Sequence, residues 1–284
     1  MIRRSFLSLV IASLCVLPAA GLATQSPQRI ISLVPALTEM LFTMGAGPQL
    51  VAVSSYDEDP PQVKSLPRVG ALLDPDVERI LSLKPDLVIT YGSQVDLQSQ
   101  LTRAGIPFFD YRHGGLAAIV ETMRALGART GHAREADAAA RDIEARLAAI
   151  RTRTAGSPKP RTLLVFGRER GALRNIYASG GRGFLHDMLE AAGGTNIFAD
   201  IDRESVQATT ELILARAPEV ILEVRSSDIL SDDEAALEAA SWKPLASVPA
   251  VRRNRVVVLT GKGLTVPGPR VTEVVEQMSR ALHR

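Results

Sequence analysis

The chain has 284 residues, of which 46% are hydrophobic and 23% are charged. This composition is ordinary for a globular protein and excludes an intrinsically disordered one, and the length is close to that of two average domains. The formal net charge is only +2, so the sequence lacks the clustered basic excess that nucleic-acid binding requires.

Residues 1–23 have the pattern of a secretory signal peptide. Arg3 and Arg4 form a short positive start, an apolar run follows from Leu7 to Ala20, and small residues precede Thr24. The run is too short for a membrane span, so we expect cleavage before Thr24 and export. A retained membrane anchor is the alternative.

Cleavage would leave a chain of balanced charge without cysteine. The only cysteine is Cys15, which lies inside the predicted leader. Loss of Arg3 and Arg4 reduces the 33 basic residues to 31, equal to the 31 acidic ones. The mature protein would therefore have neither a disulfide nor thiol chemistry, which suits an exported protein.

The first half of the mature chain alternates between predicted strands and helices. Residues 29–34 are apolar and β-branched, which predicts a buried strand, and Leu37, Leu41 and Met44 recur at helical spacing. Further strands are predicted over 49–55, 86–91 and 106–111, and further helices over 74–85 and 95–105. This alternation predicts a parallel sheet with helices on both faces.

One long helix is predicted from Ala133 to Thr154. The segment contains neither glycine nor proline, and an apolar stripe steps along it by three and four residues. Asp137 with Arg141, and Asp142 with Arg146, are acid-before-base pairs four residues apart that support the helix.

The alternation then restarts, with strands predicted over 161–167, 219–224 and 255–261 and helices over 183–194, 209–218 and 268–284. We therefore predict an α/β fold of two Rossmann-like lobes with parallel sheets. The N-terminal lobe would span 24–132, the linking helix 133–156 and the C-terminal lobe 157–284. A cleft between two such lobes is a common place to capture a small molecule.

A short sequence motif occurs once in each predicted lobe. VERILSLKPDLVI begins at Val77, and TELILARAPEVIL begins at Thr210. In both copies a proline follows seven residues after a glutamate, Glu78 or Glu211. Each glutamate falls in the first turn of a predicted helix, where the helix dipole stabilises a negative charge by about 0.3–1 kcal/mol.

Several motifs together resemble one family. RIISLVPALTEMLFTMGAG, VAVSSYDEDPPQVKSLPRVG, KPDLVI, AAGGTNIFAD and WKPLASVPAVRRNRVVVL are similar to helical-backbone periplasmic substrate-binding proteins of importers for vitamin B12, haem and ferric siderophores. The similarity covers nearly the whole mature chain. It implies a monomeric periplasmic protein, without a cofactor of its own, that delivers a large metal chelate to the permease dimer of an ABC transporter in the inner membrane.

The resemblance also implies a role for the repeated glutamates. In the family, a glutamate at the tip of each lobe docks into arginine pockets of the permease pair. Glu78 and Glu211 match these positions, and a stiff helix between the lobes would fix their separation. The alternative is that each glutamate only stabilises the start of its helix.

We expect the ligand against loops at the carboxyl ends of the strands. In the first lobe these loops carry Tyr56, Tyr91, Tyr111, Arg112 and His113. In the second lobe the segment GRERGALRNIY carries Arg168, Arg170, Arg174 and Tyr177. Tyrosine offers a flat apolar face with a polar tip, and arginine offers paired donors for carboxylates and phosphates. Tyr111 could instead cap its sheet, and the arginines could form a solvated loop.

The resemblance favours a corrinoid as the ligand, because SSYDEDPP is similar to the matching loop of vitamin B12-binding relatives. The chain departs from them at Ala71–Pro75 and Asp202–Ser205, where those relatives carry tryptophans. A ferric siderophore or haem is the alternative, with Tyr111 or His113 as the iron ligand.

Enzymatic motifs are missing from the sequence. It contains no G-x-S-x-G, H-E-x-x-H or P-loop pattern, and its four histidines form no metal-ligand spacing. We therefore expect neither catalytic residues nor a resident metal. An exported α/β enzyme is the second class of function, and a ligand-binding regulator or chaperone is the third.

Overall fold

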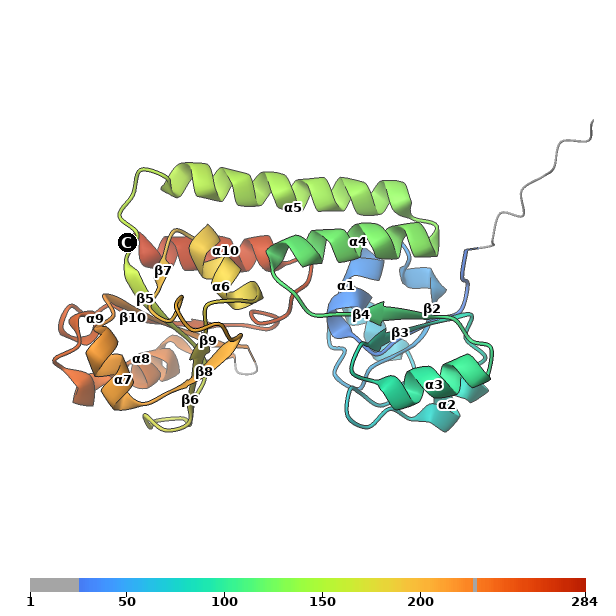
Figure 1. The fold of residues 1–284 in the computed structure, drawn as a ribbon, viewed down its shortest axis with the longest axis horizontal. Helices are drawn as coiled ribbons and strands as arrows, with labels where there is room; N and C mark the ends of the chain where they lie inside the picture. The colour runs from blue at the N-terminus through green and yellow to red at the C-terminus, as the bar shows by residue number, and fades with distance from the viewer. Residues whose placement is uncertain (1–25, 227–228) are drawn as a thin grey trace, which may run out of the picture.

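The computed structural model describes residues 26–226 and 229–284, so the predicted signal peptide and Cys15 lie outside the described residues. Two α/β lobes stand side by side, and helix α5 (Ala133–Thr154) spans both of them along one side of the molecule (Figure 1). Within these described ranges, no helix combines the length and hydrophobicity of a membrane span.

The N-terminal lobe is built on a four-stranded parallel sheet with the order β2-β1-β3-β4. Its strands are β1 (Ile30–Ser32), β2 (Leu50–Val53), β3 (Leu87–Tyr91) and β4 (Phe108–Tyr111), and its helices are α1 (Pro35–Thr43), α2 (Val77–Ser82), α3 (Val95–Arg103) and α4 (Leu116–Thr130). All three residues of β1 are fully buried, as expected for a strand covered on both faces.

The C-terminal lobe is built on a six-stranded sheet with the order β10-β9-β5-β6-β8, and β7 pairs with β5. Its strands are β5 (Arg161–Gly167), β6 (Ile176–Ser179), β7 (Thr195–Asn196), β8 (Ser205–Ala208), β9 (Val220–Arg225) and β10 (Val256–Thr260). Its helices are α6 (Phe184–Ala191), α7 (Thr210–Arg216), α8 (Asp232–Ala240), α9 (Pro249–Arg252) and α10 (Val271–Leu282).

The predicted α/β class of two lobes is confirmed, but the second sheet is not wholly parallel. β6 runs antiparallel to β5 and to β8. The cause is the turn after β5, where Gly171 and Asn175 adopt positive φ values of 67° and 51° and reverse the chain. A tight reversal of this kind joins antiparallel strands, whereas parallel neighbours need a long crossover.

Helix α5 is fixed to both lobes along its length. Its apolar stripe of Ala136, Ala140, Ile143, Leu147 and Ile150 is buried against α4 of one lobe and α10 of the other (Figure 1). These side chains belong to one continuous apolar cluster that includes residues of both lobes. The joint is therefore a packed wall of three helices, of which the sequence analysis predicted only α5 and α10.

Ion pairs on the polar side of α5 strengthen this wall. Arg124 on α4 binds Asp137 at 3.1 Å and Glu144 at 2.8 Å, and Arg153 binds Glu276 of α10 at 2.5 Å. A hinge at this joint would have to break both the apolar packing and these pairs.

Candidate functional site

Two neighbouring cavities lie between the lobes, and residues of both lobes line each of them. The larger, of about 480 Å³, is lined by Pro35, Glu39, Tyr56, Glu58 and Asp59 from the first lobe and by Ser226, Lys262, Gly263, Thr265, Val266 and Arg270 from the second. The smaller, of about 310 Å³, is lined by His113 from the first lobe and by Phe166, Arg182, Gly183, Phe184, Leu185, Glu204, Ser205 and Thr265 from the second. Thr265 lines both, so we treat them as one interlobe cleft.

Tyr56 stands in the larger cavity on a loop that is held from beneath. Its side chain is 75% exposed, although aromatic rings are usually buried. The buried Asp57 carboxylate accepts a hydrogen bond from the Ser54 backbone N–H at 2.8 Å. Arg68 donates to the carbonyls of Ser54 and Asp57 at 2.8 and 2.7 Å. The loop therefore presents an exposed ring from a rigid base, which is the arrangement of a preorganised contact.

Burial raises the pKa of the Asp57 carboxyl to about 7. The side chain is only 2% exposed, and its Oδ1 atom has no hydrogen-bond partner among the described residues. A carboxylate in such surroundings loses solvation when it ionises, which explains the direction of the change. The loop that carries Tyr56 thus contains a group that titrates near neutral pH.

A row of rings runs from the first lobe to the second. Tyr91 and Tyr111 pair edge to face with centroids 5.9 Å apart, at the facing ends of β3 and β4. His113 follows, and it meets Phe184 of α6 edge to face at 5.0 Å. The row connects three of the residues predicted for the site to a fourth that the sequence analysis did not single out.

Tyr111 is not open to an iron atom in this arrangement. Its ring is 5% exposed, and its hydroxyl lies 3.1 Å from Nδ1 of His113. The residue His113 is exposed as a whole, but its ring packs against Phe184, and this partial burial lowers the pKa of the imidazole and favours the neutral ring at physiological pH. Of the two iron ligands considered from the sequence, only His113 lines the cleft.

Arg168 does not line the cleft, so the structure contradicts its predicted role as a ligand-binding residue. The side chain is fully buried and binds Glu223 at 2.9 Å and Glu238 at 2.7 Å. Its guanidinium also lies over the buried Trp242 ring, whose N–H donates to Glu223. A buried charge needs such partners, and these partners leave Arg168 no surface to offer a ligand.

The other predicted residues of the second lobe lie outside the cavity linings. Arg170 and Arg174 are exposed and pair with glutamates, at 3.5 Å to Glu234 and 2.7 Å to Glu169. Tyr177 lies on β6 and packs beside Gly167, its partner on β5. In the first lobe Arg112 is 82% exposed and pairs with Asp110 at 3.2 Å, and it does not line the cleft either.

The charged side chains that do line the cleft are nearly balanced, and the sequence analysis missed them. Three are cationic (Arg182, Lys262 and Arg270), and four are acidic (Glu39, Glu58, Asp59 and Glu204). Ser226 follows directly after β9, and Lys262 is the second residue after β10, so the rule that located Tyr56 would have found them in the second lobe.

Glu78 and Glu211 do not line either cavity of the cleft, and they lie on helices with the same construction. Each is exposed and is the second residue of its helix, α2 or α7. Asp76 caps the first helix and Thr209 caps the second, through the same side-chain contact to a backbone N–H. Both helices lie at the edge of the molecule opposite α5, one on each lobe (Figure 1).

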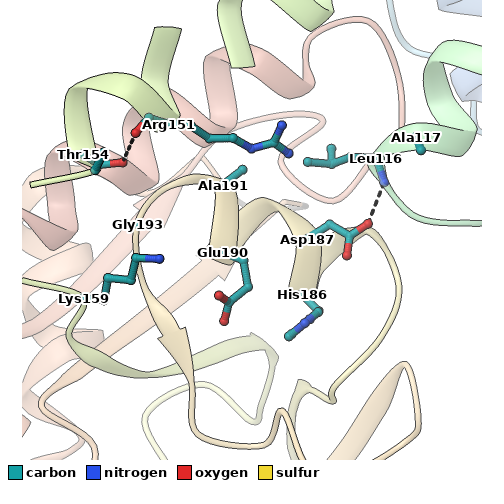
Figure 2. A pocket seen from close by; sticks show the side chains of 11 residues that line it. Leu116, Ala117, Arg151, Thr154, Lys159, His186, Asp187, Glu190, Ala191 and Gly193 are labelled. Carbon is teal, nitrogen blue, oxygen red and sulfur yellow. Dashed lines mark hydrogen bonds between the residues drawn. The ribbon is translucent and has the colours of Figure 1, made fainter. Parts of the chain in front are cut away.

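A further cavity, of about 690 Å³, lies elsewhere. It is bounded by the start of α4, the end of α5 and helix α6 (Figure 2). Asp187 there accepts a hydrogen bond from the Leu116 N–H at 2.9 Å, which ties α6 to the first turn of α4. Lys159 and Gly193 place this cavity near the amino end of β5. Ligands of α/β sheets bind at the carboxyl ends, so the interlobe cleft is the better candidate.

Comparison with known proteins identifies relatives along most of the chain. A family model described as periplasmic binding protein matches residues 30–262. A vitamin B12-binding protein of Yersinia pestis is 32% identical over 251 residues, which cover 87% of this chain and 84% of the relative.

Solved structures are similar over the same extent. The periplasmic vitamin B12-binding protein of Vibrio cholerae superimposes with a TM-score of 0.76 and 29% identity, covering 90% of this chain and 97% of the other. A periplasmic haem-binding protein of Roseiflexus superimposes with a TM-score of 0.74 and 26% identity, covering 90% of this chain and 98% of the other.

Proposed function

Because the chain belongs to the periplasmic binding protein family, we propose that it captures a corrinoid in the interlobe cleft and delivers it to an ABC importer. The members compared above are binding proteins, which agrees with a role outside catalysis. In this proposal residues 1–23 direct export to the periplasm, residues 24–132 and 157–284 form the lobes, and the protein acts as a monomer.

The charge balance of the cleft is the observation that carries the choice of ligand. A corrinoid presents carboxamide side chains, which need both donors and acceptors, whereas haem presents two propionates, and catecholate and carboxylate siderophores are also anionic. In the described lining, Lys262 and Arg270 bind carboxylates, and Arg182 lies 3.7 Å from Asp202. An anionic chelate would find its cationic partners already occupied, whereas amides can bind to paired charges of both signs.

Apolar contact would come from Tyr56 and from an aliphatic patch on the first lobe. Leu72 and Leu73 are exposed, Leu73 by 93%, within the segment where vitamin B12-binding relatives were expected to carry tryptophan. Val95 is also exposed, and Gln94 beside it donates to the carbonyls of Ala71 and Leu72. We propose that this patch replaces one of the tryptophans with a smaller aliphatic platform.

For transport we propose that Glu78 and Glu211 dock onto two similar subunits of a permease. Their equivalent positions on α2 and α7, at one edge of a molecule stiffened by α5, support two anchors at a fixed separation. Hydrogen bonding to the backbone at the start of α7 lowers the pKa of Glu211, so this carboxylate stays ionised at neutral pH.

Haem is the second candidate, and His113 is the observation that favours it. The imidazole lies in the smaller cavity with Phe166 and Phe184, and a planar ligand could stack there. His113→Ala separates the two candidates. It should abolish a haem Soret shift if the ring ligates iron, and it should leave cobalamin affinity within a few-fold if the ligand is a corrinoid.

A thermal-shift comparison tests the proposal with three probes: cyanocobalamin, haemin and ferrichrome. A ligand that binds only the native state raises the melting temperature in proportion to the logarithm of its concentration over Kd. We expect cyanocobalamin to give the largest shift. A larger shift with haemin or ferrichrome would overturn the choice of ligand but would leave the assignment to a binding protein intact.

A further inference from the structure

Arg270 of the second lobe reaches across to Glu39 of the first. Its Nε and Nη2 atoms donate to the two carboxylate oxygens at 2.9 and 2.7 Å, in the paired geometry that makes arginine–carboxylate contacts strong. The same Nη2 lies 3.5 Å from Asp59. The residue therefore binds both α1 and the loop that carries Tyr56.

The chain makes room for this contact. Gly263 has a positive φ of 77°, and a Cβ atom there would lie 2.4 Å from Nη2 of Arg270. The Glu39 side chain is only 10% exposed, and its hydrogen bonds to Arg270 raise the pKa of the guanidinium. The Glu39–Arg270 pair is thus largely enclosed, and loss of either partner would leave a charge uncompensated.

A second pair crosses the cleft nearer the solvent. Lys262 binds Glu58 at 2.5 Å, and their side chains are 50% and 64% exposed. Glu58 lies two residues after Tyr56. Lys262 lies two residues after the end of β10, directly after Gly261, which has a positive φ. Both residues line the larger cavity with Tyr56, so this pair joins the two lobes beside that ring.

We propose that these two pairs form an interlobe clasp that sets the separation of the lobes and the rate of ligand release. Glu39–Arg270 is the enclosed anchor, and Glu58–Lys262 is the exposed gate that opens first. Exposed pairs are screened by water and exchange easily, whereas enclosed bidentate pairs do not. The part of the inference that concerns release rests on the proposed function, whereas the part that concerns lobe separation does not.

The packing of the rest of the molecule explains why a clasp would matter. The three-helix wall of α4, α5 and α10 fixes the lobes on one side, so only the opposite side of the cleft can widen. The clasp joins α1 and the Tyr56 loop to the segment from 262 to 270. Its anchor lies beside the wall, because Glu39 and Arg270 also line a cavity with Asp142 and Arg146 of α5. The Glu58–Lys262 gate is the more exposed of the two pairs. A partner that pulls the lobe tips apart would have to break these pairs to free the ligand.

The distance between the lobe tips can be measured without any ligand. The predicted mature chain has no cysteine, so Leu81→Cys on α2 and Leu214→Cys on α7, both exposed, allow two spin labels in equivalent positions. Double electron–electron resonance then reports the separation. We expect Glu58→Lys, which places two lysines opposite each other, to shift the distribution to longer and broader distances. Adding Lys262→Glu, which restores an opposite-charge pair, should return it to the original.

Arg270→Gln should lengthen the distances further, because it removes the anchor. Arg174→Glu is the matched control, since it disrupts an exposed arginine–glutamate pair outside the cleft and should change nothing. If Arg270→Gln unfolds, the Glu58 and Lys262 variants still decide the question. An unchanged distribution in Glu58→Lys, or no rescue by the double exchange, would overturn the clasp.

Release is measured separately with cyanocobalamin in a stopped-flow instrument. Glu58→Lys should accelerate dissociation roughly two- to five-fold, and the double exchange should restore the original rate. If cyanocobalamin does not bind at all, the proposed ligand is wrong while the distance measurement still tests the clasp. If cyanocobalamin binds and its dissociation rate is the same in all variants, the clasp does not control release.

Discussion

Glu78 and Glu211 occupy the same place in two copies of one structural unit. Each is the second residue of a capped helix, and six residues later Lys84 and Ala217 both take a positive φ, of 49° and 45°. Left-handed backbone is uncommon for residues other than glycine, so its recurrence at matching positions shows that the repeat extends to the backbone conformation.

The strands that precede the units complete the match. Arg29 donates to the carbonyl of Leu83 at 2.7 Å, and Arg161 donates to the carbonyl of Arg216 at 2.7 Å. Their own backbone N–H groups donate to Asp86 and Glu219, the acids that follow the two prolines. Each lobe therefore positions its glutamate with the same framework, although the second sheet has additional antiparallel strands.

The first prediction concerns transport. The double variant Glu78→Ala, Glu211→Ala should fold and bind ligand normally, and it should fail to support uptake in liposomes that contain the importer. Truncating one member of a desolvated interfacial ion pair costs about 2–5 kcal/mol of association, whereas loss of a helix-dipole contact costs at most about 1 kcal/mol of stability. Glu121→Ala, an exposed glutamate on α4, is the control and should transport normally. Normal uptake by the double variant would reduce the repeat to a structural duplication.

The second prediction concerns Arg168. Its replacement by alanine leaves Glu223 and Glu238 buried beside a cavity, so the free energy of unfolding should fall by about 3–5 kcal/mol in urea titrations. Arg174→Ala, which removes an exposed arginine from the same hairpin, should change it by less than about 1 kcal/mol. Equal stability of the two variants would contradict the structural role assigned to Arg168.

The third prediction concerns Tyr56. Because the ring is exposed, Tyr56→Ala should leave the melting temperature nearly unchanged while it weakens cyanocobalamin binding about ten-fold or more. Tyr177→Ala is the matched control, since Tyr177 is partly exposed but does not line either cavity. Calorimetric titration of both variants makes the comparison, and equal affinities would place the ligand elsewhere.

The fourth prediction concerns the pH dependence of stability. The pKa of Asp57 is raised from 3.8 to about 7, so the native state holds its proton more tightly than the unfolded chain does. Its contribution is fully present below pH 3.8 and is lost as the pH rises through about 7, by up to ~4 kcal/mol. Asp57→Asn cannot ionise, so the stability of this variant relative to wild type should increase between pH 4 and pH 8. Urea unfolding at five pH values measures this difference, and a constant difference would show that Asp57 does not titrate in this range.

Sequence patterns sufficed for the class of fold because most elements have a clear period and clear ends. The apolar stripe from Ala136 to Ile150, in a segment without glycine or proline, predicts the long helix that the structure has at Ala133–Thr154. Helix α4 was overlooked although Leu116, Ile119, Val120 and Met123 follow a helical period. The pattern after β5 predicts a loop that faces the ligand, whereas the segment forms a hairpin with β6 whose residues line neither cavity, because local sequence does not show the direction in which a chain turns.

The site was predictable only where position along a strand determines position in space. Tyr56 follows β2 and lines the cleft, as the rule for parallel sheets requires. In the second lobe the same rule points to the segment after β5. Phe166 near the end of β5 does line the smaller cavity, but the hairpin residues Arg168, Arg170, Arg174 and Tyr177 that follow line neither cavity. The burial of Arg168 depends on Glu223 and Glu238, which are distant in the sequence. A local sequence pattern around Arg168 therefore could not predict that its side chain is buried.

One titration tests the central claim most directly. Isothermal titration of the mature protein with cyanocobalamin should give one site per chain with a Kd well below 1 µM, and Glu78→Ala, Glu211→Ala should give the same value. No measurable heat or spectral change with cyanocobalamin, together with tight binding of haemin that is lost in His113→Ala, would contradict a corrinoid-binding cleft and establish the haem alternative in its place.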